Sequence, residues 1–265
     1  MGDFLQLVRN ENMKIYRRPR TWVMMSILLG LVLVISILWL SFGDRNSTSM
    51  WEVVFIEASV LFLLVTIFTV VIAAGVVAEE FTTGTIKLLL IRPWSRSKIL
   101  LSKYIAVMMF AILLAVELFV STIAVNWLAF GIHADPEAAL SFPVPTGGTP
   151  VSYLLQYYAL TLVSLVVTVT LAFMLSTIFR SGGLAIGLSL FLLLGVNSFV
   201  ALIAMLDYQW IDYLLFIHLN LTQYLDGNPM REGMTLGYSL GVLAVYYILF
   251  IAVTWYVFNK RDVAA

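Results

Sequence analysis

Residues 53–78 read VVFIEASVLFLLVTIFTVVIAAGVVA, and Glu57 is the one charged side chain in this stretch. An α-helix needs about 20 mostly apolar residues to cross the hydrocarbon core of a bilayer. Lipid offers no hydrogen-bond partner to open backbone groups, so a crossing segment inside one chain has to be helical. The stretch therefore predicts a membrane-spanning helix.

The rest of the chain repeats this pattern. Hydrophobic residues make up 62% of the sequence and charged residues 11%, whereas a soluble domain is about half apolar and about a quarter charged. We predict an all-α membrane protein with one transmembrane domain over residues 1–265. The six predicted spans cover about 21–42, 53–78, 104–131, 152–178, 184–206 and 235–257.

The distribution of Lys and Arg predicts the orientation. Of the fifteen, only Arg45 and Arg231 fall on one predicted side of the membrane. Positive residues are retained in the cytoplasm, so both termini are predicted to be cytoplasmic. The residues on the cytoplasmic side are Arg9, Lys14, Arg17, Arg18, Arg20, Lys87, Arg92, Arg96, Lys98, Lys103, Arg180, Lys260 and Arg261.

Residues 3–18 predict an amphipathic helix on the inner surface of the membrane. Its apolar side chains recur at helical spacing, although Glu11 falls near the apolar arc. Its basic residues suit an anionic lipid surface. Pro19 is expected to end this helix and to let the chain turn into the bilayer. The interface residues are Phe4, Val8, Ile15, Arg17 and Arg18.

A second short helix is predicted at 82–91, between the second and third spans. Ile86, Leu89 and Leu90 form its apolar stripe. Thr82 or Thr83 can cap its start and Pro93 ends it, while Ser95 can cap the helix of the third span. The short helix cannot span a membrane, so its apolar side needs a cover, which is either lipid or a partner protein.

Two acidic residues fall inside predicted spans. A charge there costs several kcal/mol unless it is paired, hydrated or neutralised. Glu117 near the middle of the third span is therefore a candidate functional residue, or else a structural glutamate facing another helix. Glu57 lies nearer the outer end of the second span, and the two are expected at different depths. Asn197 is a further candidate for a pore or packing contact.

The outer loops differ in character. Residues 133–151 contain four of the seven prolines and predict an irregular loop. Residues 207–234 contain an apolar, aromatic stretch that is too short to cross, which suits a re-entrant or interfacial element. Glycines spaced by four at the start of the fifth span and into the sixth permit close helix approach, within one chain or between two.

Several chemistries are excluded by what the sequence lacks. There are no cysteines, so disulfides and thiolate sites are absent. No G-x-x-x-x-G-K-[ST] phosphate loop and no H-E-x-x-H zinc motif occurs, so we expect no metal or cofactor in this chain. The formal net charge is zero, which gives no reason to expect a nucleic-acid partner.

The segment 79–104 resembles the permease subunits of type-2 ABC exporters. The shared features are an acidic pair that ends the second span, a Gly-Thr pair, a leucine-rich helix, a proline and a Ser-Arg start to the third span. The layout of the whole chain is similar as well. In this sequence the features are Glu79-Glu80, Gly84-Thr85, Leu88-Leu89-Leu90, Pro93 and Ser95-Arg96.

The resemblance implies a transport subunit of a bacterial plasma membrane that performs no chemistry itself. Residues 82–91 would be a coupling helix that docks into a separate ATP-binding subunit, which holds the ATP and Mg²⁺. Two such subunits would serve two permease chains, identical or paralogous, that export a peptide or another amphipathic compound. The implied coupling residues are Glu79, Glu80, Thr82, Thr83, Gly84, Thr85, Ile86, Leu89, Leu90 and Arg92.

Two other functions are compatible with parts of the sequence. A secondary transporter would use Glu117 as a proton carrier and would need no ATPase. An intramembrane protease would use the acidic pair at 79–80, but position 83 is threonine, so the arginine of the E-E-x-x-x-R motif is missing. The sequence determines neither the cargo nor whether the second permease chain is identical or a paralogue.

Overall fold

The computed structural model describes residues 2–43, 49–84, 94–131, 149–196, 199, 208–225, 227, 229–231 and 233–260. Every regular element in these ranges is helical. Five helices are long and apolar enough to cross a membrane. They are α2 (Pro19–Phe42), α3 (Met50–Thr82), α5 (Arg96–Phe130), α6 (Pro150–Ile178) and α10 (Leu236–Lys260).

The predicted end of the first helix before Pro19 and the predicted cap at Ser95 are confirmed. The N-terminal helix α1 (Gly2–Tyr16) ends three residues before Pro19, which begins α2. The side chain of Ser95 accepts a hydrogen bond from the Lys98 backbone N–H and caps α5. A capping box at Thr149 and Ser152 starts α6. Ordinary capping rules therefore locate these boundaries.

The fifth predicted span differs from the other five in the described residues. Helix α7 (Gly182–Leu190) continues as a single π-helical turn, η1 (Phe191–Gly195). The described stretch Gly182–Gly195 forms an apolar helix of 14 residues, and a crossing takes about 20. Most of the remainder of 184–206 lies outside the described residues, so a sixth crossing stays a prediction.

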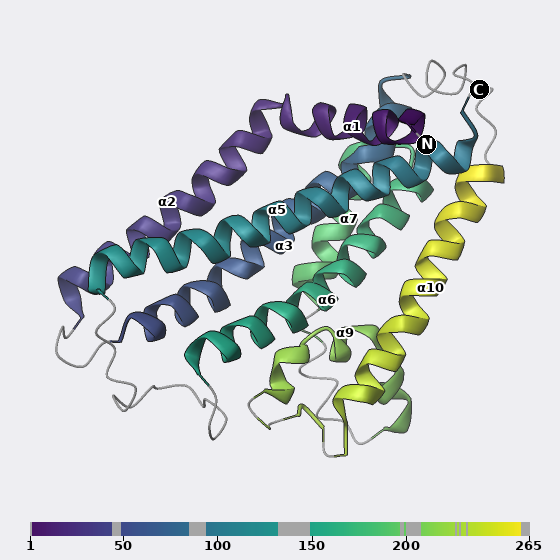
Figure 1. Cartoon of the computed structure of the whole chain (residues 1–265). Helices are drawn as coiled ribbons and strands as arrows, with labels where there is room; N and C mark the ends of the chain where they lie inside the picture. Colours follow the sequence, from purple (N-terminus) through teal and green to yellow (C-terminus); the bar gives the residue numbers. More distant parts are fainter. Residues whose placement is uncertain are drawn as a thin grey trace.

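Helix α3 lies in the middle of the bundle and contacts α2, α5, α6 and α7. The main core is built around it from fully buried side chains such as Val65, Phe110, Leu114 and Leu118. Helix α1 lies across the end of α5, and α10 packs along α6 at the opposite edge (Figure 1). The N-terminal helix and the last turn of α10 lie at the same end of the bundle (Figure 1).

At the far end of α10, residues 208–225 form three short helical turns rather than a span. These are η2 (Gln209–Tyr213), α9 (Leu215–His218) and η3 (Leu221–Tyr224). His218 is fully buried there, with Nδ1 2.8 Å from Ser239 Oγ and Nε2 2.8 Å from the Asp212 carbonyl oxygen. Nδ1 thus ties this element to α10, while Nε2 holds two of its own turns, η2 and α9, together.

Helix α2 is attached to the bundle by a narrow stripe. Its buried residues are Thr21, Leu28, Val32 and Ser36, and most of its other side chains face outward. Their spacing of seven, four and four residues places them on one side of the helix. The attachment of α2 therefore depends on few contacts.

Candidate functional site

The most highly charged part of the described structure lies where α1, α3 and α5 meet. Lys103 of α5 is fully buried, and its Nζ lies 2.8 Å from Glu11 Oε2 and 2.6 Å from Glu80 Oε1. Lys14 Nζ approaches the same two carboxylates, at 2.6 Å and 3.0 Å. Two ammonium groups and two carboxylates thus alternate in a closed ring.

This ring explains how four charges can lie so close to an apolar core. A buried charge is tolerated only when it is paired and hydrogen-bonded. Glu11 is 3% exposed and Glu80 is 12% exposed, so each carboxylate depends on the two ammonium groups. Glu11 and Lys14 come from α1, Glu80 from the last turn of α3, and Lys103 from the first turns of α5. The ring therefore fastens three helices together.

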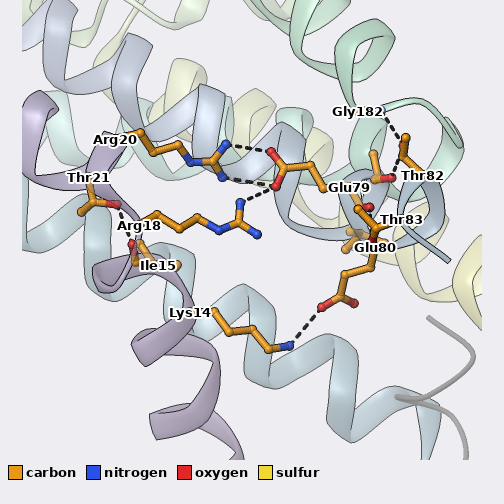
Figure 2. Close-up of polar contacts among 12 residues, drawn as sticks. Lys14, Ile15, Arg18, Arg20, Thr21, Glu79, Glu80, Thr82, Thr83 and Gly182 are labelled. Atoms are coloured by element: carbon orange, nitrogen blue, oxygen red, sulfur yellow. Dashed lines mark hydrogen bonds and ion pairs between the residues drawn. The ribbon is translucent and has the colours of Figure 1, made fainter. Parts of the chain in front are cut away.

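A second set of ion pairs lies beside the ring and involves Glu79. The Arg20 guanidinium donates to both carboxylate oxygens, at 2.8 Å and 3.4 Å, and Arg18 Nη1 donates to Oε2. Figure 2 shows both guanidinium groups directed at this carboxylate, with the Lys14–Glu80 pair below them. Of the acidic pair that ends α3, Glu79 thus holds the beginning of α2, and Glu80 holds α1 and α5.

The corner between α1 and α2 is closed by side chains. Pro19 has no backbone N–H, so it cannot donate to the Ile15 carbonyl group four residues before it, at the end of α1. Thr21 Oγ1 donates to the Ile15 carbonyl oxygen at 2.6 Å, and Trp22 Nε1 donates to that of Tyr16 at 2.9 Å. Two side chains of α2 therefore satisfy the end of α1 across the proline.

The end of α3 is also joined to the connection between α6 and α7. Thr82 Oγ1 donates to the Arg180 carbonyl oxygen at 3.0 Å and accepts from the Gly182 backbone N–H at 3.2 Å. A Cβ on Gly182 would lie 3.2 Å from Glu79 Cγ, so glycine permits this close approach. All the long described helices except α10 are thus tied, directly or through Thr82, to the base of α3.

The space among these charges is small. A cavity of about 30 Å³ is lined by residues that include Glu11, Arg20, Glu80 and Lys103. Such a volume holds a water molecule or two and is far too small for a nucleotide. In the described part of the chain no cluster of three or more His, Asp and Glu side chains could hold a metal ion.

The pKa values of the α1 residues follow from this arrangement. Burial by itself would raise the pKa of Glu11, but Lys103 and Lys14 outweigh burial and lower it below its ordinary 4.5. Burial would lower the pKa of Lys14, but Glu80 and Glu11 outweigh it and raise it above 10.5. Both groups therefore stabilise the folded arrangement in their charged forms.

Acid is expected to release α1 from the bundle. Since the pKa of Glu11 is lowered on folding, its contribution is complete above pH 4.5 and is lost as the pH falls through the folded value. Pepsin cleavage within α1, normalised to an unfolded peptide of the same sequence, should therefore accelerate below pH 4.5. In Glu11→Gln cleavage should already be fast above that pH. A wild-type rate that stays flat down to pH 2, about two units below 4.5, contradicts this.

The predicted coupling residues are placed only in part. Glu79, Glu80, Thr82, Thr83 and Gly84 are described, whereas Thr85, Ile86, Leu89, Leu90 and Arg92 lie outside the described residues. One boundary was wrong. Thr82 is the last residue of α3, Thr83 is its C-cap, and Gly84 follows with φ +71°. The last turn of α3 is closed by the Thr83 backbone N–H, which donates to the Glu79 carbonyl oxygen, so no separate helix begins at 82.

The predicted interface helix is present but differs in its contacts. Its buried residues are Leu7, Val8, Glu11 and Ile15, while Phe4 is half-buried and Arg17 is exposed. The face packs on α5 through Leu7 and Ile99. Arg18, assigned to the lipid surface by sequence, instead pairs with Glu79. The apolar face therefore contacts protein.

The two intramembrane glutamates are separate, as predicted. Glu57 is fully enclosed and contacts Ser36 and Asn126. Glu117 is partly exposed in the middle of α5, and its Oε2 is buried without a hydrogen bond to any described residue. The Asn197 side chain lies outside the described residues. The pore roles of these three residues remain predictions.

Sequence reasoning missed the roles of Glu11, Arg20, Lys103 and Gly182. A signal did exist for Glu11, since an acidic residue on the apolar face of an amphipathic helix requires a cation. At the glycines singled out by spacing, at 183, 187, 233, 237 and 241, nothing lies within 4 Å of the position that a Cβ would take. Spacing alone could not identify Gly182 as the position of close approach.

These apolar helices and their arrangement define an all-helical, multi-pass membrane protein. The chain belongs to the family described as "Protein of unknown function (DUF2705)", whose profile matches residues 21–264. "Uncharacterized protein YhcI" of Bacillus subtilis (strain 168) is 35% identical over 313 aligned positions that cover 98% of this chain and 99% of that protein. "Uncharacterized membrane protein YdbK" of the same organism is 34% identical and covers 76% of this chain and 78% of its own length.

Proposed function

We propose that this chain is the membrane-spanning permease subunit of an ATP-driven exporter, with ATP hydrolysis in a separate ATP-binding subunit. The observation that carries the proposal is the charged base of α3, by which we mean Glu79 and Glu80 together with the charged side chains that pair with them. Glu79 and Glu80 pair with residues of α1, of the start of α2 and of α5, immediately before the segment that resembles a coupling helix. A displacement of that segment would be transmitted to four helices through these ion pairs.

The proposed mechanism is mechanical. ATP and Mg²⁺ bind the partner subunits, two copies of which move the segments after Gly84 in two permease chains, identical or paralogous. A packed core is bistable rather than continuously deformable, so a small displacement at its edge is converted into a change between two packings. The charged base holds α1, α2, α3 and α5 in register during that change. A peptide or other amphipathic cargo then leaves along the lipid-facing surface.

The proposal includes the topology. With six crossings and a bacterial plasma-membrane location, the positive-inside distribution places the charged base in the cytoplasm. There it would lie within reach of a soluble ATPase. The membrane-interface position of α1 fits this placement, since its exposed side carries Arg9 and Arg17.

A proton-coupled secondary transporter is the second candidate. It is favoured by Glu117, whose Oε2 is buried without a hydrogen bond to any described residue. Such a protein would transport along a pH gradient without an ATPase, and Glu117→Gln would abolish transport. A protease is less consistent with the site, because two ammonium groups engage the Glu80 carboxylate.

Leu89→Asp tests the proposed function. We expect the tagged wild-type chain to copurify from its native membrane with a soluble ATP-binding-cassette protein, and Leu89→Asp to lose at least 90% of it, about 1.4 kcal/mol or more of binding free energy. The reason is that a carboxylate would replace an apolar docking side chain. Leu88→Asp, off the predicted stripe, is the matched control and should retain the complex. Absence of any such ATPase from the wild-type preparation would overturn the proposal.

A further inference from the structure

Glu57 is the most completely enclosed carboxyl group among the described residues, and the charged base does not involve it. It lies in α3, two turns from the start of the helix, and is 0% exposed. Ser36 Oγ of α2 lies 2.7 Å from Oε1, and Asn126 Nδ2 of α5 lies 2.6 Å from Oε2. Ser36 Oγ is also 3.2 Å from Asn126 Oδ1. Three helices thus meet at one carboxyl group.

The hydrogens available to these atoms decide the state of the carboxyl group. Asn126 Nδ2 also donates to the Thr122 carbonyl oxygen at 2.9 Å, so the nitrogen of that amide faces Thr122 and Glu57. Ser36 has a single hydroxyl hydrogen. If Glu57 were ionised, Ser36 would have to share that hydrogen between Glu57 Oε1 and Asn126 Oδ1. One of the two close oxygen contacts would then have no hydrogen.

A protonated Glu57 removes this conflict. Its O–H on Oε1 donates to Ser36 Oγ, Ser36 donates to Asn126 Oδ1, and Asn126 Nδ2 donates to Glu57 Oε2. Each of the three contacts then has one hydrogen, and the ring closes. If the Asn126 amide were turned over, the ring would again close only with a carboxyl hydrogen, and the contact with Thr122 would be lost.

The surroundings favour a neutral group. Helices α2 and α5 contribute Ser36, Asn126 and Thr122, and α6 contributes Tyr158 as the nearby titratable group. Among the described residues, no Lys, Arg or His forms an ion pair with Glu57. An isolated carboxylate at this depth costs several kcal/mol. A neutral acid in a complete hydrogen-bond ring avoids that cost.

We propose that Glu57 is a proton-binding site, and that the bound proton closes a ring with Ser36 and Asn126 that fastens α2 to α3 and α5. Ser36 is one of the few buried residues of α2, so the ring is a main attachment of that helix. Loss of the proton would leave a bare charge between three helices and would loosen α2. The inference does not depend on the transport mechanism proposed above.

Infrared spectroscopy of the purified full-length protein in lipid tests the proton directly. A protonated carboxylic acid gives a C=O stretch that is separate from the carboxylate bands and shifts in D₂O. At neutral pH we expect such a band in the wild type and in Glu117→Gln, and its loss in Glu57→Gln. A Glu57→Gln spectrum that matches the wild type in this region would overturn the proposal.

Thermal unfolding of the same variants gives a second, independent readout. The amide of Glu57→Gln can replace the acid in the ring, because its N–H donates to Ser36 and its oxygen accepts from Asn126. We therefore expect an unchanged melting temperature for Glu57→Gln and a lower one for Glu57→Ala and Ser36→Ala. A melting temperature clearly above that of the wild type in Glu57→Gln would indicate that a charge had been removed, and would contradict the proton.

Discussion

Replacing Lys103 with methionine is expected to lower the free energy of unfolding by about 3–5 kcal/mol, the usual cost of removing one partner from a buried ion pair. Methionine is similar in length to the lysine stem, so little packing volume is lost. The loss comes from Glu11 and Glu80, whose carboxylates would both lose the fully buried ammonium group that pairs with them. Thermal unfolding in detergent, followed by tryptophan fluorescence, measures the change.

Two variants separate this effect from a general effect of losing a lysine. Lys98 lies on the same helix, is exposed, and sits 5.7 Å from the centre of the Trp94 ring. Lys98→Met should cost no more than about 1 kcal/mol, as for an exposed cation–π contact. Adding Glu11→Gln and Glu80→Gln to Lys103→Met should restore much of the lost stability, because no buried carboxylate is then left without Lys103 and the Lys14 ammonium group is half-exposed to solvent. A triple variant as unstable as Lys103→Met would show that packing, and not charge, is responsible.

Replacing Glu79 with leucine is expected to detach the beginning of α2, with a loss of about 1.5–3 kcal/mol, typical of hydrogen bonds to charged groups. Two guanidinium groups would lose their common acceptor. The chain has no cysteine, so a single cysteine at Thr21, which is fully buried at this junction, reports the opening. Its labelling rate by a maleimide should rise in Glu79→Leu and much less in Glu79→Gln.

Gly75→Ala approaches the same carboxylate sterically. A Cβ on Gly75 would lie 2.6 Å from Glu79 Oε1, so the carboxylate has to move away from Arg20. We expect the cysteine at position 21 to label faster in this variant as well. Gly30→Ala in α2 is the matched control, because nothing lies within 4 Å of a Cβ there. Equal labelling in Gly75→Ala, Gly30→Ala and the parent would contradict the role assigned to Glu79.

Much of the helical layout could be predicted from sequence because it depends on local properties. The apolar stretch at 53–78 is contained within α3, and Pro19 and Ser95 mark helix starts by their own chemistry. The bounds were less certain. Helix α3 runs to Thr82 rather than 78, and near that end Ser176 of α6 accepts from the backbone N–H groups of Val77 and Ala78. That residue is distant in sequence.

The residue partners in the charged base could not be predicted from sequence in this way. In the sequence, Lys103 could not be distinguished from the other positive residues that are predicted near the inner membrane surface. Its partners lie 92 and 23 residues away. Which carboxylate a buried lysine meets depends on how α1 lies across α5, and helix periodicity does not contain that information. The same holds for Ser36 and Asn126, which meet Glu57 from two other helices. Side-chain type indicated that partners were needed, whereas tertiary packing determined which they are.

The closed corner at Pro19 has a consequence for how force passes through the molecule. With the last carbonyl groups of α1 bound by Thr21 and Trp22, α1 and α2 are held at a fixed angle. They would therefore move together as one rigid unit rather than turn independently at Pro19. A sideways displacement of α1 would tilt α2. The far tip of α2, one bilayer away, would therefore swing even if nothing touched it directly.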